Sequence, residues 1–557
     1  MTRNTPKDNP TGIHQQLSNH QALLASPPDQ LSSLFLRDPE RTSKLTFACG
    51  PLRVDLSKNL LDERALQLLI SLAEEQELPA RRQALLDGET VNTTERRAAL
   101  HTALRGYRAA NQPETGREVE QVLDQMQAFV EQIHAGQRRG SSGEKIRDVV
   151  NIGIGGSDLG PAMVTAALRR QHNTSLRCHF VSNIDPAHLQ ACLATLDPAS
   201  TLFIVASKSF STLETLNNAL LARQWLLTAD ADADVSRHFV AVSSNIKAAT
   251  EFGIAASNIF PMWDWVGGRF SLWSAIGLPI ALATSMATFR QLLSGAALMD
   301  QHFAETPLEQ NIPVLLGLLT VWYRNYWNAG SHVVLPYAQD LAMLPGYLQQ
   351  LDMESLGKSV DLAGNALAMQ SGPVIWGSAG TNGQHSFHQL LHQGTQMIPA
   401  DFIAVAQADT QASEQARTQH QYLLANCFSQ SRALMCGKTV AQAEQELLDQ
   451  GLPGAEATRL APHKRVPGNR PSTTIVLEKL DALSLGCLLA TYEHKVFVQS
   501  VIWNINAFDQ WGVEIGKQLC TPLFEALQSG ASSSELDASS AALVAYCRQQ
   551  TSGGVKD

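Results

Sequence analysis

The sequence predicts an α/β fold with parallel sheets, preceded by a helical N-terminal region and followed by a helical C-terminal end. From residue 147 onward, short apolar strands end in polar loops that lead into helical stretches. The first two such strands are Val149–Ile152 and Leu202–Ala206. Strands that alternate with helices favour parallel pairing, and ligands then bind beyond the carboxyl ends of the strands. The loops after these two strands are therefore the first candidates for a site.

A second unit with the same alternation begins near Thr306. Its strand candidates are Val333–Pro336, Pro373–Trp376 and Phe402–Val405. No sequence period relates the two halves, so the pattern predicts that they share an architecture but not that their sequences are repeats.

Helical spacing of apolar residues marks the two ends of the chain. The first ~140 residues are predicted to be mainly helical, from stretches such as Ala65–Glu77 and Val119–His134. After Pro522 the pattern is helical again, with a break at Gly530–Ser534 and a terminal helix at Ala538–Gln549.

Composition narrows the possible partners and compartments. The 557 residues are 44% hydrophobic and 17% charged, which suits several buried cores, and the net charge of −10 argues against nucleic acid as a partner. The eight cysteines contain no CxxC pair, so neither a zinc site nor a disulfide framework is indicated. The longest apolar runs, Ala275–Thr284 and Ile312–Tyr323, are shorter than the ~20 residues that span a bilayer. With no secretory signal pattern at the N-terminus, we expect a cytoplasmic protein that binds neither nucleic acid nor membrane.

The glycine loop after the first strand spans Gly153–Gly160. No Gly-Lys-Ser/Thr follows it, and Asp158 stands where a dinucleotide fingerprint has its third glycine. No nucleotide cofactor is therefore expected. The loop is either a tight turn alone or a place where a ligand approaches backbone amides at a helix start.

The loop after the second strand, Ser207–Glu214, is rich in hydroxyl groups. Ser211 and Glu214 fit a capping box at a helix start, which would use one or two hydroxyls and leave the others free. Hydroxyls beside helix-start amides suit a phosphate dianion.

Four further segments carry candidate chemical groups. Arg269 follows paired glycines in apolar surroundings, which favours a paired or functional guanidinium. Gln350 and Glu354 share one face if helical, and His385 stands in a polar glycine loop. A carboxylate and an imidazole are the pair that a sugar isomerase needs to move a proton and open the ring. Lys517, near a tryptophan and two glycines, is expected to be partly buried.

Several of these segments closely resemble those of the glucose-6-phosphate isomerase family. They keep the family's order from about residue 45 to 520. The segments are NTTERRAALHTALR (92–105), NIGIGGSDLGP (151–161), SKSFSTLET (207–215), GGRFSLWSAIGLP (267–279), DMESLGKS (352–359), GTNGQHS (380–386) and YEHKVFVQSVIWNINAFDQWGVEIGKQL (492–519).

The resemblance implies a domain plan and a reaction. The plan is a helical N-terminal region (1–140), two sugar-isomerase-type αβα domains (141–300 and 301–520) and a C-terminal helical arm (521–557). The reaction is the reversible isomerisation of glucose 6-phosphate to fructose 6-phosphate through a cis-enediolate, as in glycolysis and gluconeogenesis. It implies a homodimer with shared active sites, and neither metal nor cofactor.

The resemblance also implies roles for single residues. Glu354 resembles the base that carries the proton between C1 and C2, and Arg269 the cation that stabilises the enediolate. His385, from the partner subunit, and Lys517 resemble the ring-opening pair. The implied substrate-binding residues are Ser157, Ser207, Lys208, Ser209, Thr212, Gln350 and Gln510.

Two departures from the family's pattern bear on the loops. Ala379 stands where a proline is common, and Ser209 and Ser211 where threonines are common. Both departures keep the groups that the chemistry needs, so we expect them to affect only the rigidity of the loops and the affinity for substrate.

Three other functions remain open from sequence. A relative that also accepts mannose 6-phosphate would keep the same glutamate. A phosphosugar-sensing regulator would need a DNA-binding segment, which the N-terminal region does not suggest, and an extracellular signalling role has no signal peptide to support it.

Overall fold

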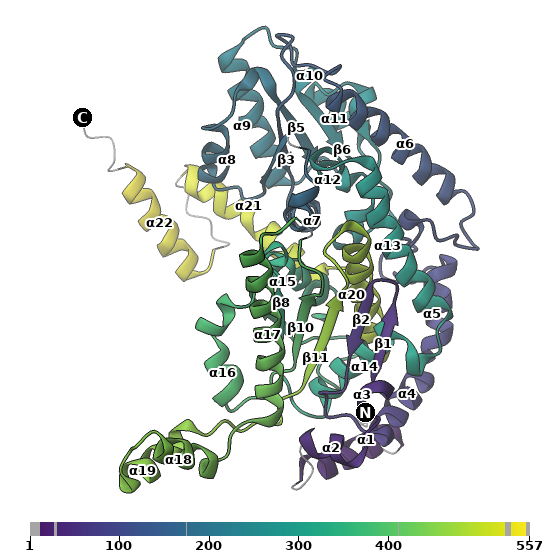
Figure 1. The fold of residues 1–557 in the computed structure, drawn as a ribbon. Helices are drawn as coiled ribbons and strands as arrows, with labels where there is room; N and C mark the ends of the chain where they lie inside the picture. Colours follow the sequence, from purple (N-terminus) through teal and green to yellow (C-terminus); the bar gives the residue numbers. More distant parts are fainter. Residues whose placement is uncertain (1–11, 27–30, 174, 410, 530–535, 553–557) are drawn as a thin grey trace. The chain divides into compact units, whose positions relative to one another are not determined.

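The computed structural model describes residues 12–26, 31–173, 175–409, 411–529 and 536–552. The expected α/β fold is confirmed: two sheets form within residues 1–507 and helices cover them (Figure 1). Residues 508–557 form a second compact unit, described by itself below.

The first sheet has five strands, all parallel, in the order β4-β3-β5-β6-β7. The strands are β3 (Asp148–Ile152), β4 (Arg177–Val181), β5 (Thr201–Ala206), β6 (Phe239–Val242) and β7 (Ile259–Phe260). The two strands predicted in this region are β3 and β5. Both are buried at every position, as expected for central strands of a sheet covered on both faces.

The second sheet has six strands in the order β1-β2-β11-β10-β8-β9. They are β1 (Thr46–Cys49), β2 (Leu52–Asp55), β8 (Ser331–Tyr337), β9 (Val374–Gly377), β10 (Ala400–Val405) and β11 (Ser472–Leu477). The three predicted strands are confirmed as β8, β9 and β10. The β1–β2 hairpin was not predicted; it pairs antiparallel with β11, so the N-terminal region contributes the edge of this sheet.

Helices cover both faces of the two sheets (Figure 1). In the first, α8, α9 and α11 pack on a core that includes Phe203 and Phe239. In the second, α16 and α17 pack on a core that includes Tyr337 and Phe402. The helices of this unit are α1 (Ile13–Ala25), α2 (Leu31–Arg37), α3 (Arg41–Lys44), α4 (Glu63–Glu75), α5 (Leu78–Asp87), α6 (Thr115–His134), α7 (Leu159–Ala167), α8 (Pro186–Leu193), α9 (Leu213–Ala229), α10 (Val235–His238), α11 (Ile246–Phe252), α12 (Leu278–Ala283), α13 (Met286–Glu305), α14 (Ile312–Asn325), α15 (Leu344–Gln349), α16 (His388–Gln393), α17 (Glu414–Cys436), α18 (Val440–Asp449), α19 (Gly454–Lys464) and α20 (Ala482–Ile502).

The helix α20 lies at the centre of this unit. It packs along α13 and α14 and also contacts β2 and the segment Gln350–Glu354. Nearly all of its residues are buried, although four consecutive ones, Tyr492–Lys495, carry polar or charged groups. A helix buried on all sides needs a partner for each of those groups.

The C-terminal unit contains α21 (Glu514–Ser529) and α22 (Ala538–Ser552). The guanidinium of Arg548 on α22 donates to the carbonyls of Ala526 and Leu527 on α21, each at 3.0 Å. The predicted terminal helix is confirmed as α22, and the predicted break at Gly530–Ser534 lies outside the described residues. The domain boundaries expected at residues 140, 300 and 520 stay predictions.

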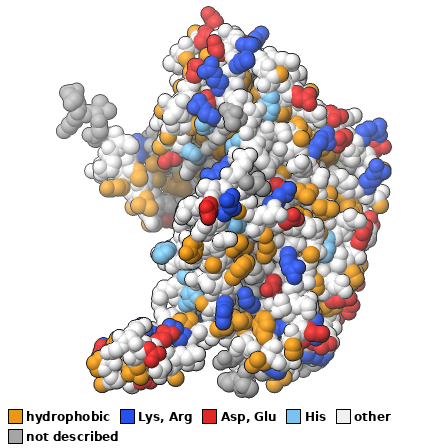
Figure 2. All heavy atoms as spheres, viewed as in Figure 1, with side chains coloured by type: hydrophobic (Ala, Val, Ile, Leu, Met, Phe, Trp, Pro, Cys, Tyr) orange, Lys and Arg blue, Asp and Glu red, His pale blue; other side chains and the backbone are white. Residues whose placement is uncertain are grey.

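Within the described residues, no helix is long and apolar enough to cross a membrane. On the face that Figure 2 shows, Lys and Arg side chains are interspersed with Asp and Glu.

Candidate active site

The glycine loop packs directly against the segments that carry Arg269 and Gln350. A Cβ on Gly156 would lie 2.0 Å from the carbonyl oxygen of Gly268 and 2.8 Å from the amide nitrogen of Arg269. A Cβ on Gly155, whose φ is +59°, would lie 2.9 Å from the side-chain nitrogen of Gln350. These glycines permit a close approach of backbones, which gathers three predicted segments at one place.

Ser157 closes the glycine loop just before α7. Its carbonyl oxygen accepts a hydrogen bond of 3.0 Å from the side chain of Asn151 at the end of β3. The loop is therefore held to the carboxyl end of a central strand, where ligands of parallel sheets bind.

The hydroxyl loop forms a tight turn at the carboxyl end of β5. Ser207 Oγ lies 3.1 Å from Thr212 Oγ1, and Ser209 Oγ lies 2.6 Å from Ser211 Oγ. Phe210 takes a left-handed conformation, with φ of +51°, and its ring is buried beneath the turn. The hydroxyls are thus paired with one another above an apolar anchor.

The capping box predicted for Ser211 and Glu214 is wrong. The helix α9 begins at Leu213, its N-cap is Thr212, and no side chain caps it. The reason is that Ser211 and Thr212 bond to other hydroxyls of the turn. The first amides of α9 keep their N–H groups without a capping side chain, and such a helix start attracts an anion.

Lys208 ties the hydroxyl loop to the segment before Arg269. Its Nζ donates to the carbonyl oxygens of Asp264 at 3.0 Å and Val266 at 3.1 Å. Burial, and then the positive charge of Arg97, hold the pKa of the Lys208 ammonium below its ordinary value. The second loop is thereby linked to the same group of segments.

Arg269 is 3% exposed, which agrees with the expectation that it is not a solvated surface arginine. Its Nε donates to Ser355 Oγ at 2.6 Å, and its Nη2 donates to the carbonyl of Ala507. Its Nη1 lies 3.7 Å from Glu354 Oε2. A guanidinium held at several points has a fixed orientation.

Gln350 and Glu354 lie on one turn of helix, as predicted, but it is a π-helix that spans Gln350–Glu354 and continues α15. Wide turns of this kind are rare and frequently occur at functional sites. The side chain of Glu354 is 22% exposed, so its carboxylate lies between the buried Arg269 and the solvent side.

His385 stands apart from these groups. It ends a 3₁₀ turn, Asn382–His385, which is anchored to β8 by a 2.9 Å hydrogen bond from Gln384 to the hydroxyl of Tyr337. The imidazole is exposed. Among the described residues, no hydrogen bond or ion pair joins it to Glu354 or Arg269.

Gln510 and Lys517 belong to the C-terminal unit. Gln510 immediately precedes a 3₁₀ turn, Trp511–Val513, and Lys517 lies on α21. The expectation that Lys517 is partly buried is wrong, because it is exposed together with its apolar neighbours Val513 and Ile515.

Sequence reasoning gave no role to two buried residues close to Glu354 in the chain, Ser355 and Asp352. Ser355, which accepts the hydrogen bond from Arg269, follows Glu354 directly, but no spacing rule distinguishes it from any other buried serine. Asp352, which pairs with Lys495, was not given a role either. Both lie in a segment whose other members were recognised.

The assembled groups suit proton transfer beside a developing negative charge. A carboxylate at the edge of the solvent lies beside a buried cation, and hydroxyls with helix-start amides lie on a linked loop. Among the described residues, no three His, Cys, Asp and Glu side chains are placed to hold a metal ion together. General-base chemistry with electrostatic stabilisation is what this set can perform.

Comparison with known proteins gives matches over nearly the whole chain. The family model described as phosphoglucose isomerase matches residues 55–544. A glucose-6-phosphate isomerase of Hahella chejuensis is 50% identical over 99% of both chains, and one of Shewanella baltica is 51% identical over 95% of this chain and 98% of that one. The crystal structure of a glucose-6-phosphate isomerase from Chlamydia trachomatis superposes with a TM-score of 0.81 at 31% identity, over 97% of this chain and 98% of that one.

Proposed function

The chain belongs to the phosphoglucose isomerase family, and from this premise we propose that it interconverts glucose 6-phosphate and fructose 6-phosphate by proton transfer at Glu354. The observation that carries the proposal is the 3.7 Å approach of the Glu354 carboxylate to the buried guanidinium of Arg269. The role of the enzyme is in glycolysis and gluconeogenesis.

Glu354 acts as the base on both carbons. In the open-chain sugar it removes the proton from C2, and the electron pair left behind forms the C1=C2 double bond of the cis-enediolate while the carbonyl oxygen O1 takes the negative charge. The proton is then returned to C1 as the hydroxyl proton of O2 passes to O1, which leaves the carbonyl at C2. As the proton from C2 arrives at Glu354, the negative charge passes from Glu354 to the oxygen of the enediolate. Arg269 lies beside the carboxylate before this step and stabilises the sugar oxygen after it, so the charge never moves far from the guanidinium.

The phosphate of the substrate binds at the hydroxyl turn and the start of α9. Ser207, Ser209 and Thr212 exchange their hydrogen bonds within the turn for bonds to the phosphate oxygens. Lys208 and Ser157 are further contacts of the substrate in this proposal. The free first amides of α9 add further donors. Gln350 and Gln510 contact the sugar hydroxyls or the phosphate side.

The ring is opened by His385 and Lys517, which exchange a proton between the ring oxygen and the C1 hydroxyl. We propose that the enzyme is a homodimer, with His385 supplied to the site of the other subunit. An exposed imidazole on an anchored turn supports this. So does the apolar face of α21, where Ile515, Leu519 and Phe524 are exposed in the single chain.

We also propose a cytoplasmic location. All eight cysteines are free, and three of them, Cys436, Cys520 and Cys547, are exposed. Exposed unpaired thiols persist in a reducing compartment.

A coupled assay tests the proposed reaction. Fructose 6-phosphate is added to the protein in the presence of EDTA, and glucose 6-phosphate is followed. We expect activity to survive exhaustive chelation, because a carboxylate and a guanidinium supply the proton transfer and the charge stabilisation. Loss of activity in EDTA, with recovery on addition of zinc or manganese, would contradict the mechanism.

The phosphate site should be separable from the chemistry. Ser209→Ala with Thr212→Ala is expected to raise KM, through about 1–3 kcal/mol of lost hydrogen bonding, and to leave kcat largely intact. Thr228→Ala is a matched control, because its hydroxyl lies near the end of α9, away from the turn, and bonds to the carbonyl of Gln224. If the double variant binds substrate normally, these hydroxyls serve only to hold the turn.

A further inference from the structure

Four consecutive residues of α20, Tyr492–Lys495, are buried and polar, and each has its own partner. Successive helical residues point about 100° apart, so the four partners surround the helix. The Tyr492 hydroxyl donates to Asp401 at 2.9 Å, and the Glu493 carboxylate accepts from Trp273 at 2.7 Å and from Arg105. His494 Nε2 lies 2.7 Å from Asp300 Oδ1, and the Lys495 ammonium donates to Asp352 Oδ2 at 3.1 Å. Three of these contacts join core elements to one another, whereas the fourth reaches the turn that carries Glu354.

The ion pair of Lys495 with Asp352 is buried almost completely. The Lys495 side chain is 2% exposed and that of Asp352 is 3% exposed. The second carboxylate oxygen of Asp352, Oδ1, has no hydrogen-bond partner among the described residues. Because a buried charge without a partner is strongly unfavourable, Asp352 depends on Lys495.

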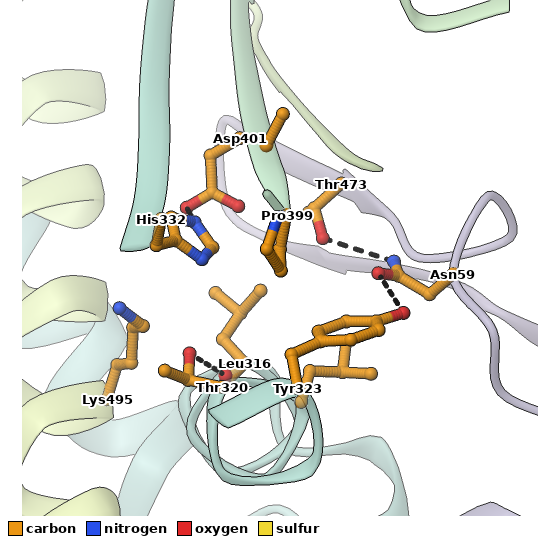
Figure 3. A pocket seen from close by; sticks show the side chains of 11 residues that line it. Asn59, Leu316, Thr320, Tyr323, His332, Pro399, Asp401, Thr473 and Lys495 are labelled. Atoms are coloured by element: carbon orange, nitrogen blue, oxygen red, sulfur yellow. Dashed lines mark hydrogen bonds and ion pairs between the residues drawn. The ribbon is translucent and has the colours of Figure 1, made fainter. Parts of the chain in front are cut away.

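The groups around Lys495 favour its pairing with Asp352. Figure 3 shows Lys495 on one side of a small cavity and Asn59 on the other. The carboxylate that lines this cavity, Asp401, already binds the hydroxyl of Tyr492 and lies 3.0 Å from His332 Nε2. The cavity has a volume of about 10 Å³, room for roughly one water molecule, so the Lys495 ammonium is not solvated in bulk.

Asp352 and Glu354 lie on the same π-helix but on different sides of it. Residues two apart on a helix do not face each other. Asp352 points into the core toward α20, whereas Glu354 points toward Arg269 and is partly exposed. The turn is therefore held from both sides, by Lys495 through Asp352 and by Arg269 through Ser355.

We propose that Lys495 is a positioning residue: by holding Asp352, it fixes the rotation of the π-helix and thereby places the Glu354 carboxylate against C1 and C2 of the substrate. This inference rests on the proposed role of Glu354 as the base. A displacement of about 1 Å at the reacting groups can lower a rate by roughly 100-fold, so a small rotation of the turn is enough to affect turnover.

The test compares three variants of the full-length enzyme. Lys495→Met removes the charge and keeps the length of the side chain. Lys495→Met with Asp352→Asn also removes the charge left behind. Tyr492→Phe is the matched control, since it deletes one buried polar atom of the same helix whose partner, Asp401, is on β10 and not on the π-helix.

We expect kcat for isomerisation to fall about 10- to 100-fold in both Lys495 variants, with KM nearly unchanged. Ring opening, followed as interconversion of the substrate anomers on the same protein, should keep its normal rate. Tyr492→Phe should lower the Tm without lowering kcat. A general loosening of the core would instead change kcat, KM and ring opening together, in all three variants.

Several results would overturn the proposal. A folded Lys495 variant with kcat within about threefold of the wild type is one, and a Tyr492→Phe variant that loses as much kcat is another. If Lys495→Met does not fold, the double variant decides, because it leaves no unpaired buried charge. Failure of the double variant to fold would show that the pair serves the whole core and not the turn.

The outcome is distinguishable from failure of the proposed function. If Glu354→Gln abolishes turnover while the Lys495 variants keep it, only the positioning role is wrong. If Glu354→Gln itself keeps turnover, the base has been misidentified.

Discussion

Replacement of Glu354 by glutamine is expected to lower the turnover number for isomerisation by about 10²–10⁴-fold. The amide keeps the size of the side chain and most of its hydrogen bonding, but it has no basic lone pair to take the proton from C2. It also cannot form the ion pair that the carboxylate makes with Arg269 at 3.7 Å. Substrate binding should change little, because the phosphate turn at Ser207–Thr212 is untouched.

The measurement is kcat and KM in the coupled assay, with Tm as a check on folding. Met353→Leu is a suitable control, since it alters the exposed neighbour of Glu354 on the same turn and removes no ionisable group. A Glu354→Gln enzyme with near-normal turnover would show that another group is the base.

Mixed dimers should recover activity from two inactive parents. If His385 is supplied across the subunit boundary, a heterodimer of His385→Ala and Glu354→Gln subunits has one intact site and one doubly damaged site. Random reassociation makes about half of all dimers mixed, so about a quarter of the wild-type activity should return. The experiment dissociates the two variants, mixes them equally, reassociates them and compares turnover with each parent treated alone.

A second mixture provides the control for this recovery. Arg269 and Glu354 lie in one chain, with their side chains 3.7 Å apart. Mixing Arg269→Lys with Glu354→Gln subunits should therefore restore nothing when both variants are inactive alone. No recovery with His385→Ala, once subunit exchange has been verified, would place His385 and Glu354 in the same subunit.

Most of the strands that sequence predicted are buried almost continuously, although β9 was predicted and is only partly buried, and β6 is buried throughout and was not predicted. β5 and β10 are buried at every position, and each is a short apolar run followed by polar residues. β4 was not predicted, because its residues are mostly half-buried and include Arg177 and His179, which pair with Asp148. The hairpin β1–β2 was missed for a related reason: its four-residue strands gain their stability from pairing with β11, which is more than 400 residues away in the chain.

The members of the site were recognisable from their chemistry and their motifs, but their geometry was not. Sequence placed Gln350 and Glu354 on one helical turn, but it did not predict that the turn is a π-helix. The residues that bond to this segment, Arg269 and Lys495, come from distant parts of the chain. The predicted capping box does not form because Ser211 bonds to the hydroxyl of Ser209 and not to a helix amide. The exposure of Lys517 was not predictable either, because an apolar helix face is buried only if another element covers it, and local sequence does not show that.

The most direct test of the account follows one half of the reaction, the entry of solvent deuterium at C1 of fructose 6-phosphate. The substrate is incubated in heavy water with wild-type or Glu354→Gln enzyme, and NMR measures both deuterium at C1 and the interconversion of the ring anomers. The account predicts that the variant still opens the ring, through His385 and Lys517, but incorporates deuterium at least 100-fold more slowly than the wild type. Deuterium entering at the wild-type rate in Glu354→Gln, or no deuterium entering at all with the wild type while isomerisation proceeds, would contradict proton transfer by Glu354.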